Sequence, residues 1–290
     1  YRVERLMGRG GMGAIYTGVN IYNAAERVAI KTILPDETAG ERFEKHLLDE
    51  SNALMRVRHD AVVPYRTYGR VGEHGAYYLV LEFIDGEPLD DFYARRPLSE
   101  KELFALARRL AAGLEAAHEE GLVHRDVAPD NVLLPQSQLE RATLIDFGIA
   151  KIGEADGLAG AQFAGKLSFA APEQFVPGAR IGPHTDVYSL ALVLAAAARG
   201  KSIPLGTSIA SAQEARRGVP DLAGVPPAIA SVLARMLEPH PSDRPQSMRE
   251  VLALLDEAER NPRPAAPPPS PAPKPAGKAA GIRRGERPKE

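Results

Sequence analysis

The sequence predicts an α+β protein in which a small β-rich part precedes a larger, mainly helical part. Upstream of Gly86, the runs Arg27–Ile33 and Tyr77–Phe83 are rich in β-branched and aromatic residues and are bounded by glycine or charged residues, which is typical of strands. Downstream of Gly86, apolar residues recur at intervals of three and four, which indicates helices. The 290 residues are enough to bury a substantial core.

One helix is expected within the β-rich part, from Ala39 to Val57, because its apolar residues follow helical spacing. These residues are Phe43, Leu47, Leu48, Leu54 and Met55. A second helix is expected after Ser99, since Glu102 follows three residues later and the pair forms a capping box. Its apolar positions are Leu103, Leu106, Leu110 and Leu114.

A β-hairpin and three further helices complete the expected elements. The apolar runs Val132–Leu134 and Thr143–Ile145 flank a polar turn, which predicts the hairpin. The helices are expected at Asp186–Ala198, Pro227–Leu237 and Ser247–Arg260. Proline, alanine and basic residues dominate from Asn261, so residues 261–290 are predicted to be a disordered linker with polyproline character. A ligand for an SH3 domain is the alternative for this segment.

Composition and charge exclude several classes of protein. The net charge of −2 argues against a dedicated nucleic-acid binder, which needs a basic face. The absence of cysteine excludes disulfides, thiolate catalysis and cysteine-bound zinc. No apolar run approaches the ~18 residues of a membrane span, so we expect a soluble, cytoplasmic segment. The sequence begins at Tyr1 without a methionine and shows no signal peptide, so we expect a piece of a longer protein, which leaves open an anchor beyond Glu290.

A glycine-rich segment matches the pattern G-x-G-x-x-G through Gly8, Gly10 and Gly13, with Gly11 as an additional glycine. The pattern alone is weak, because it would arise by chance in such a chain with a probability of roughly 0.2. In a dinucleotide site such glycines open a helix, whereas between two antiparallel strands they lie over nucleotide phosphates. The β-like run after Gly13 favours the second arrangement. A glycine-rich hairpin without a ligand is the simplest alternative.

A strand ending in Lys31 follows this segment. Most lysines are solvated surface residues, so the interpretation depends on its position after the glycines and before an acidic helix. An ammonium group at this position would hold phosphates, and a helical carboxylate would fix its direction. Glu50 is the preferred partner, and Asp49 and Glu44 are the alternatives.

The segment His124–Asn131 (HRDVAPDN) carries the most specific signal in the chain. Four fixed residues at this spacing are expected by chance with a probability on the order of 10⁻³. Apolar residues bracket the segment closely, so a solvated surface turn is a poor alternative. Asp126 is predicted to accept the proton of a substrate hydroxyl, and Asn131 to hold a magnesium ion.

A second acidic motif, Asp146-Phe-Gly, follows the apolar run Thr143–Ile145. A carboxylate at the end of a strand, with a glycine two residues later, is a reasonable magnesium ligand. The segment Ala171-Pro-Glu173 closes the loop that begins there.

With these motifs in order over Tyr1–Arg260, the chain resembles the protein kinase superfamily, and specifically the bacterial eukaryotic-like serine/threonine kinases. The GxGGMGxxY loop, the APEQ segment and the helix start TDVYS are similar to that branch. The resemblance implies the two-lobed protein kinase fold over residues 1–260, with an antiparallel N-terminal lobe (1–85) and a mainly helical C-terminal lobe (86–260). It also implies ATP and Mg²⁺ as cofactors, and phosphorylation of serine or threonine on protein substrates, including the chain itself.

The resemblance further implies roles for individual residues. Asp186 would brace the segment His124–Asn131, which is the catalytic loop of such kinases, and Glu173 would pair with Arg244. Residues of both lobes would surround the adenine: the gatekeeper and hinge residues Leu81, Glu82 and Ile84, and the apolar residues Ile15, Ala29 and Leu133. An internal hydrophobic column would contain His124, Phe147 and Leu54.

Two positions depart from the serine/threonine kinase pattern. Ala128 stands two residues after the catalytic aspartate in place of lysine, and Lys166 stands upstream of APE in place of threonine. Tyrosine kinases also carry alanine at the first position, but they place arginine where this chain has Asp130. We predict that the Lys166 ammonium lies beside Asp126 and replaces the missing cation. The alternative is a weakened enzyme with Lys166 in solvent.

Two other functions stay open on the sequence alone. A pseudokinase would be a nucleotide-binding signalling scaffold without transfer activity, and only Ala128 suggests it. A small-molecule phosphotransferase on a kinase-like fold is disfavoured, since the APE segment and the motif around Arg244 usually accompany a platform for protein substrates.

The loop between Asp146 and Glu173 contains a single hydroxyl residue, Ser168. Kinases often order this loop by phosphorylation. Here we predict that Glu154 or Asp156 supplies a fixed negative charge instead, and the alternative is that both acids are simply solvated.

Overall fold

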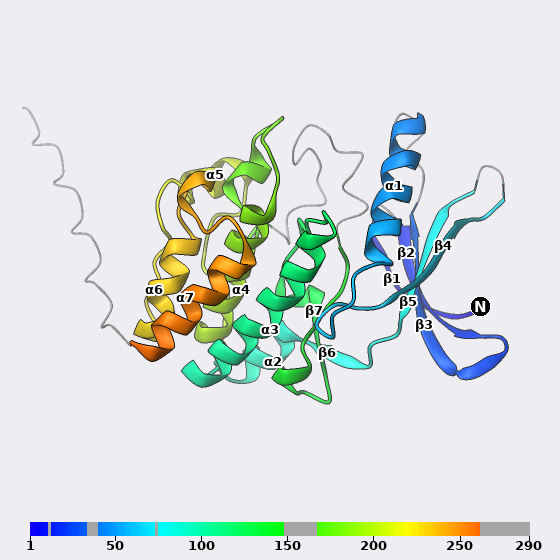
Figure 1. Cartoon of the computed structure of the whole chain (residues 1–290), viewed down its shortest axis with the longest axis horizontal. Helices are drawn as coiled ribbons and strands as arrows, with labels where there is room; N and C mark the ends of the chain where they lie inside the picture. The colour runs from blue at the N-terminus through cyan, green and yellow to red at the C-terminus, as the bar shows by residue number, and fades with distance from the viewer. Residues whose placement is uncertain (11–12, 34–39, 73–74, 148–166, 262–290) are drawn as a thin grey trace, which may run out of the picture.

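The computed structural model describes residues 1–10, 13–33, 40–72, 75–147 and 167–261 (Figure 1). A β-sheet and one helix form a smaller N-terminal lobe at the right of Figure 1, and helices dominate a larger lobe at the left. This arrangement confirms the predicted α+β fold with two lobes. Along the described residues, no helix combines the length and the apolar character needed to cross a membrane.

The sheet of the smaller lobe has five antiparallel strands in the order β1-β2-β3-β5-β4. Their bounds are Arg2–Gly10 (β1), Gly13–Asn20 (β2), Asn23–Ile33 (β3), Tyr65–Arg70 (β4) and Tyr77–Glu82 (β5). Side chains alternate between the two faces of a strand. Val28 and Ile30 of β3 therefore pack with Val80 on one face, while Ala29 and Lys31 lie on the other. The alternation determines which face of the sheet carries the lysine.

Helix α1 (Gly40–Leu54) packs on that second face. Leu47 and Leu54 are seven residues apart and so share one side of the helix, where both are buried in one apolar cluster with Leu79 and Leu81 of β5. The helix ends three residues before the expected Val57. Its last turn is tighter than α-helical, since the Arg56 N–H donates to the Ala53 carbonyl oxygen at 2.9 Å.

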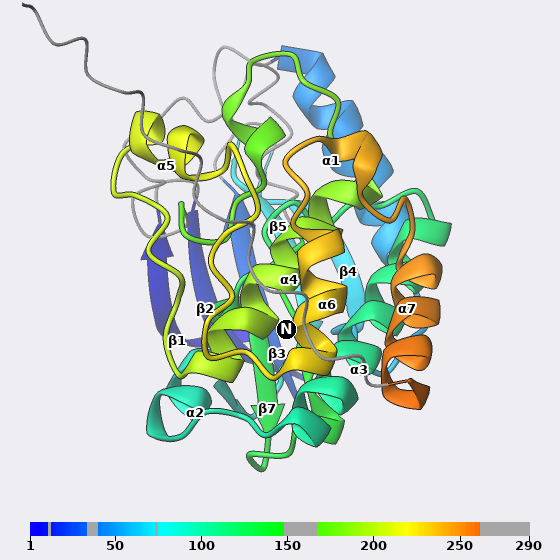
Figure 2. The same ribbon diagram turned by 90° about the vertical axis from the view of Figure 1, so that its left-hand side faces the viewer.

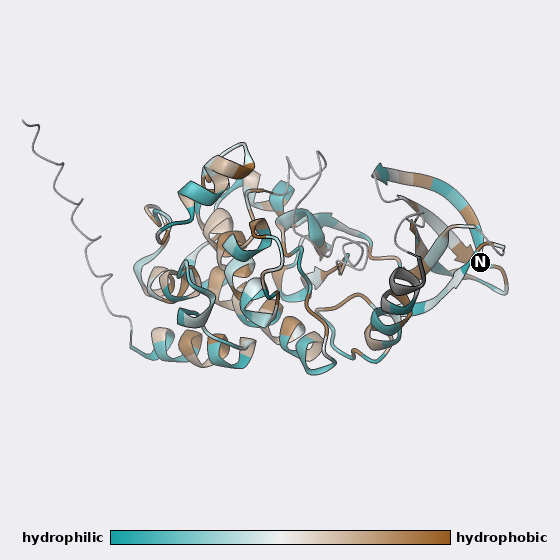
Figure 3. Ribbon diagram, turned by 90° about the horizontal axis from the view of Figure 1, so that it is seen from above, coloured by the Kyte–Doolittle hydropathy of each residue, from teal (hydrophilic) through white to brown (hydrophobic). Residues whose placement is uncertain are grey.

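The larger lobe is built around helix α4 (Figure 2). Its helices are α2 (Leu89–Arg95), α3 (Glu100–Glu119), α4 (Pro183–Arg199), α5 (Ile209–Ala215), α6 (Pro227–Met236) and α7 (Met248–Arg260). Helix α4 is buried along most of its length, as expected for a helix that is apolar all round, and α2, α3, α6 and α7 contact it. The outer helices alternate hydrophilic and hydrophobic residues, which is the pattern of helices with one buried side (Figure 3).

Most of the predicted elements are confirmed, and several short ones were missed. Helix α3 begins at the expected capping box of Ser99 and Glu102, and the three later helices lie within three residues of their expected bounds. Helix α4 begins at Pro183 and not at Asp186, because proline suits the first turn of a helix. The missed elements are β4, α2, α5 and the strand β6 (Gly86–Pro88).

The predicted hairpin is present as β7 (Val132–Pro135) and β8 (Thr143–Leu144). Strand β6 adds to it, giving a small three-stranded antiparallel sheet in the order β6-β7-β8. The hairpin also bonds to the chain that follows α1, since the Val63 N–H donates to Leu144 at 3.0 Å and the Leu144 N–H donates to Ala61 at 2.8 Å. The sheet therefore lies where the two lobes meet.

Candidate active site

The ends of the hairpin bring two polar motifs together. Asn131 ends a short 3₁₀ turn (Pro129–Asn131) just before β7, and Asp146 follows β8 by two residues. The Ile145 N–H donates to the Asn131 carbonyl oxygen at 2.9 Å, so the two ends are bonded to each other. The Asn131 side-chain amide donates to Asp126 twice, to its carbonyl oxygen at 2.8 Å and to its carboxylate at 3.0 Å. Asp126, Asn131 and Asp146 therefore belong to one site.

The donor atoms offered by this site are carboxylate and amide oxygens. Hard divalent cations prefer such ligands, and the residues present fit one. Among residues with described positions, no cluster of three or more His, Cys, Asp or Glu side chains forms a self-sufficient metal site. A cation held by Asn131 and Asp146 would take further oxygen ligands from water and phosphate.

Lys31 reaches this site from the sheet of the smaller lobe. Its ammonium nitrogen lies 2.7 Å from Asp146 Oδ1, and the two side chains are 19% and 25% exposed. The pairing of β3 with β5 sets the position of Lys31 opposite Leu79. The contact is a charge-assisted hydrogen bond between the lobes.

The structure places Glu50 differently from the expectation. Among the described residues, Lys31 pairs with Asp146, while the Glu50 carboxylate lies 3.7 Å from the Arg125 guanidinium. Each side chain is thus engaged by a different partner, Asp146 for the Lys31 ammonium and Arg125 for the Glu50 carboxylate. Burial raises the pKa of Glu50 to about 7, and the nearby charge of Arg125 only partly offsets that effect. The expected Lys31–Glu50 ion pair is therefore not formed in this arrangement of the lobes.

Two residues of the site, Arg125 and Asp146, have left-handed backbones with φ of 62° and 63°. Such a conformation costs a non-glycine residue about 1–2 kcal/mol, so the surroundings must stabilise it. At Arg125 the stabilising group is Asp186, which accepts hydrogen bonds from the backbone N–H groups of Arg125 at 2.9 Å and His124 at 2.7 Å. This contact confirms that Asp186 braces the catalytic loop.

Asp186 is completely buried and stays ionised. Burial acts to raise its pKa, but the hydrogen bonds from His118 and from the His124 backbone N–H outweigh burial and hold the pKa below its usual value. His118 Nε2 lies 2.8 Å from the carboxylate. No motif in the sequence indicates this role for His118, which lies in the last turn of α3, six residues before His124.

The expected hydrophobic column is present. The rings of His124 and Phe147 are 4.4 Å apart, and Phe147 lies in the same apolar cluster as Leu54 of α1. Burial lowers the pKa of His124 despite the neighbouring carboxylates, so its ring is neutral at pH 7. The column joins the helix of the smaller lobe to the catalytic loop.

The glycine-rich segment joins β1 and β2 as two antiparallel strands, which excludes the dinucleotide-type arrangement. Gly8 pairs with Ile15, and Gly10 pairs with Gly13. At Gly13 φ is +152°, and a Cβ atom there would lie 1.8 Å from the Thr32 carbonyl oxygen. Only glycine fits such a close approach.

The residues expected around adenine lie on both lobes. Ala29 pairs with Leu81 across β3 and β5, and Ile15 pairs with Lys31 across β2 and β3. Leu133 is half-buried on β7. The Glu82 side chain is engaged by Arg66 of β4 at 2.6 Å, and the Glu82 N–H donates to the Pro64 carbonyl oxygen at 2.9 Å, so both groups already have partners.

Ile84 packs against the apolar cluster beneath the sheet. Its position two residues after β5 places it on the connection between the lobes. The structure therefore gives it the location expected of a hinge residue, and its contact with adenine stays a prediction.

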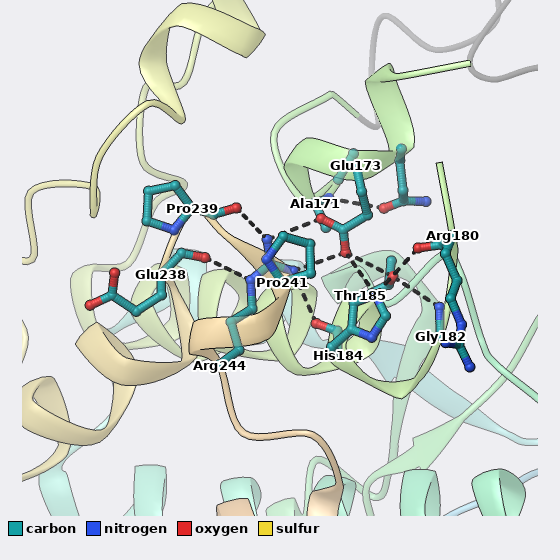
Figure 4. Close-up of polar contacts among 12 residues, drawn as sticks. Ala171, Glu173, Arg180, Gly182, His184, Thr185, Glu238, Pro239, Pro241 and Arg244 are labelled. Carbon is teal, nitrogen blue, oxygen red and sulfur yellow. Dashed lines mark hydrogen bonds and ion pairs between the residues drawn. The ribbon is translucent and has the colours of Figure 1, made fainter. Parts of the chain in front are cut away.

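A second polar centre lies beyond the site, where Glu173 and Arg244 form the expected ion pair (Figure 4). Two nitrogens of Arg244 donate to the two oxygens of Glu173 at 2.9 and 3.0 Å, and both side chains are buried. The Thr185 hydroxyl donates to the same carboxylate at 2.8 Å. This bidentate pair ties the APE segment to the start of α4 and to the chain before α7.

Gln174 is a residue that the sequence analysis missed. Its side-chain amide donates to the Arg125 carbonyl oxygen at 2.9 Å and accepts from the Ala171 N–H at 2.9 Å. The glutamine was noted only as part of the APEQ segment. The position of Gln174 directly after Glu173 was the signal in the sequence that could have indicated its role. Its side chain connects the APE segment to the catalytic loop.

Several predictions fall outside the described residues. These concern Gly11, Gly148, Lys166, Glu154, Asp156 and the tail after Asn261. Two alternative partners were considered for Lys31. Asp49 is exposed, and the side chain of Glu44 lies outside the described part of the structure.

Known proteins share both the sequence pattern and this architecture. The family model of the protein kinase domain matches residues 1–254. The serine/threonine-protein kinase pkn2 of Myxococcus xanthus is 32% identical over 271 residues, covering 89% of this chain and 32% of that protein. PknA of Mycobacterium tuberculosis is 30% identical over 282 residues, covering 93% of this chain and 64% of that protein.

The crystal structure of the Mycobacterium tuberculosis PknI kinase domain is similar over most of the chain. It aligns with a TM-score of 0.68 at 28% identity and covers 88% of this chain and 94% of that one. The chain spans about a third of the length of pkn2 and just under two thirds of PknA. From the family match and the site that its residues form, the chain belongs to the protein kinase family.

Proposed function

We propose that this chain is the catalytic domain of a serine/threonine protein kinase that uses ATP and Mg²⁺. The observation that carries the proposal is the convergence of Lys31, Asp126, Asn131 and Asp146 between the lobes. The names of the relatives, which are serine/threonine-protein kinases, support the choice of substrate class. A cytoplasmic location, where ATP is available, stays our expectation.

Each residue of the site has a role that follows from its chemistry. Bound Mg²⁺–ATP supplies the phosphoryl group and offsets its negative charge. Asp146 and Asn131 offer oxygen ligands to the metal, and Lys31 offers a positive charge to the phosphates. We expect Lys31 to exchange its contact with Asp146 for the phosphates, with Glu50 as the carboxylate that then orients it.

Asp126 acts on the substrate. The carboxylate is held by the Asn131 amide at 3.0 Å, so its orientation is fixed before the substrate binds. The substrate hydroxyl oxygen forms a bond to the γ-phosphorus while the bond to the ADP oxygen breaks, and the hydroxyl proton passes to Asp126. Lys166 remains our candidate for the cation that Ala128 lacks.

The test is a transfer assay with radiolabelled ATP, Mg²⁺ and myelin basic protein as the acceptor. We expect labelled phosphoserine or phosphothreonine after acid hydrolysis of the product, together with self-phosphorylation. Asp126→Asn is the matched control, since it keeps the size of the side chain and removes the base. Labelling of neither protein, or equal labelling by the parent and Asp126→Asn, would contradict the proposal and favour a pseudokinase.

A further inference from the structure

Arg216 is the largest side chain that is completely buried in the described structure, with 1% of its surface exposed. It lies immediately after α5, as the capping residue of that helix. Arginine is rarely buried, and a buried guanidinium usually pairs with a carboxylate. Burial lowers the pKa of Arg216, which reflects the cost of removing this charge from water. The contacts of the side chain must therefore offset the cost of removing the guanidinium from water.

The guanidinium of Arg216 is bound by four backbone carbonyl oxygens. Two belong to the segment before APE: Nε donates to Ala170 at 2.9 Å and Nη2 donates to Leu167 at 2.5 Å. Nη1 donates to Ala212 of α5 at 3.0 Å and to Leu205 at 3.2 Å. The fork of donors thus joins α5 to residues 167–170.

The segment 167–170 needs such an external partner. It forms neither helix nor strand, so its carbonyl groups have no partners from regular secondary structure. Leu167 and Ala170 are buried in a small cluster with Phe175 and Ala212, apart from the main core. The guanidinium lies over the Phe175 ring at 5.1 Å and closes this cluster.

A second buried arginine, Arg244, holds the other end of the same segment through Glu173 (Figure 4). Tyr188 of α4 lies between the two arginines: Arg244 stacks on its ring at 4.6 Å, and the charge of Arg216 acts on its hydroxyl. Burial raises the pKa of Tyr188 to about 12, so the hydroxyl stays neutral between the two cations. Residues 167–173 are therefore fixed at both ends by guanidinium groups.

This fixed segment continues into the catalytic loop. Gln174 accepts from the Ala171 N–H and donates to the Arg125 carbonyl oxygen, one residue before Asp126. A displacement of residues 167–170 would thus change the surface beside the catalytic carboxylate. An error of about 1 Å in the position of a reacting group can cost roughly 10²-fold in rate.

We propose that Arg216 is a positioning residue for the protein substrate. By holding the Leu167 and Ala170 carbonyl groups, it sets the position of the surface on which the acceptor chain lies beside Asp126. This inference rests on the proposed kinase function and deepens it. Among the described residues, the hydrogen-bond partners of Arg216 all lie in the larger lobe, and we expect nucleotide binding to be independent of it.

Two variants and one matched control test the proposal. Arg216→Lys keeps the charge but cannot span four carbonyl groups, and Arg216→Met removes the donors. Arg217→Met is the control, because the neighbouring arginine is 78% exposed and pairs only with Glu214 in the described structure. Three reactions are compared at fixed Mg²⁺: phosphorylation of myelin basic protein, binding of a fluorescent ATP analogue, and hydrolysis of ATP by water.

For Arg216→Lys we expect kcat/KM for myelin basic protein to fall by about 10- to 100-fold, mainly through KM. Binding of the ATP analogue and hydrolysis by water should stay within about twofold of the parent, since neither uses residues 167–170. Arg216→Met should lose more, and Arg217→Met should match the parent. Parental KM for the protein in Arg216→Lys would overturn the proposal. So would an equal loss in all three reactions, which would indicate a purely structural role.

Hydrogen exchange of the intact domain, without substrate, separates this inference from the proposed function. Arg216→Lys should speed exchange of the amides in residues 167–176 by tenfold or more while leaving α4 unchanged. If the parent phosphorylates no protein, the proposed function fails, and the exchange rates still decide whether Arg216 holds the segment. If Arg216→Met does not fold, Arg216→Lys alone decides both measurements, and unchanged exchange in it overturns the proposal.

Discussion

The two sides of the active site are held in different ways. On the larger-lobe side, the contacts are buried and multiple: Asp186 is fully buried between backbone N–H groups and a histidine, and Glu173 forms a bidentate pair with Arg244. On the smaller-lobe side, Lys31 and Glu50 each form one ion pair with a described residue, and the side chains involved are partly exposed. The difference indicates that the larger lobe fixes the catalytic loop, whereas the positions of Lys31 and Glu50 depend on how the lobes meet.

The comparison is tested most strongly by removing one partner of the buried pair. Arg244→Met leaves the Glu173 carboxylate buried without its cation, which typically costs about 3–5 kcal/mol of the free energy of unfolding. Urea unfolding followed by circular dichroism measures the change. Arg217→Met, at an exposed pair, should change it by less than about 0.5 kcal/mol. Equal effects of the two variants would refute the view that burial of the Glu173–Arg244 pair stabilises the larger-lobe side of the site.

Catalysis should separate the two sides next. Asp126→Asn should lower phosphate transfer by ~10²-fold or more, the usual scale for losing a general base, while the affinity for ATP stays nearly unchanged. Lys31→Met should weaken ATP binding and transfer together, because it removes the charge that faces the phosphates. Nucleotide titrations and initial rates on both variants distinguish the outcomes. A Lys31→Met enzyme with parental ATP affinity would show that Lys31 is not the phosphate-binding lysine.

A smaller effect is expected from the titration of Glu50. Its pKa is about 7 in the folded protein and near 4.5 when unfolded, so the folded state binds more protons between these values and loses stability as pH rises. Glu50→Gln removes this loss. It should match the parent near pH 4.5 and exceed its free energy of unfolding by roughly 1–3 kcal/mol at pH 8.

The groups around Glu50 make this prediction specific. Burial is the main cause of the raised pKa, and Arg125 opposes it. Tyr65 lies near both Glu50 and Asp146, and its hydroxyl stays protonated because its pKa is well above the usual value. A difference between parent and Glu50→Gln that does not change with pH would show that Glu50 is ionised throughout. Transfer activity should fall in the variant, since glutamine cannot orient Lys31 by charge.

The smallest effect is expected at the exposed surface of the larger lobe. Arg108 of α3 pairs with Asp256 at 3.0 Å and with Glu259 at 2.7 Å on α7. Exposed pairs contribute about 0–1 kcal/mol, and salt screens them. Arg108→Ala should therefore lower stability by less than about 1 kcal/mol, with a smaller loss in 0.5 M NaCl. A loss of stability as large as that of Arg244→Met would contradict the expectation that exposed ion pairs stabilise the protein less than buried ones.

The sequence predicted local structure well where a motif restricts the backbone conformation or the position of a side chain. The HRD and DFG motifs and the capping box at Ser99 were located from the residues, because a carboxylate, a cap or a glycine at fixed spacing restricts the local structure. The pair Glu173–Arg244 followed from the resemblance to protein kinases and is present. The hairpin that carries Asn131 and Asp146 followed from two short apolar runs. The roles of these residues toward ATP and metal remain predictions.

The sequence did not predict contacts that depend on how whole elements pack. The partner of Glu50 is set by the placement of α1 on the sheet, and Asp49 and Glu44 could not be excluded by spacing. Arg216 follows a short helix that periodicity did not detect, and nothing in its neighbours marks it as buried. Strand β4 was missed because its run of tyrosine, arginine and glycine lacks clear alternation.

The hydrogen bonds between β8 and the chain after α1 have a consequence for motion. Because Ala61 and Val63 are bonded to Leu144, the chain that leaves the C-terminal end of α1 is attached to the larger lobe, and we expect a tilt of this helix to pivot near that end. Glu50 lies four residues from that end, which is about 6 Å along the helix axis at ~1.5 Å per residue. A tilt of about 20° would therefore shift its carboxylate by only ~2 Å, a distance comparable to one hydrogen-bond length. A modest rotation of α1 is therefore enough to move the Glu50 carboxylate from Arg125 to another cation.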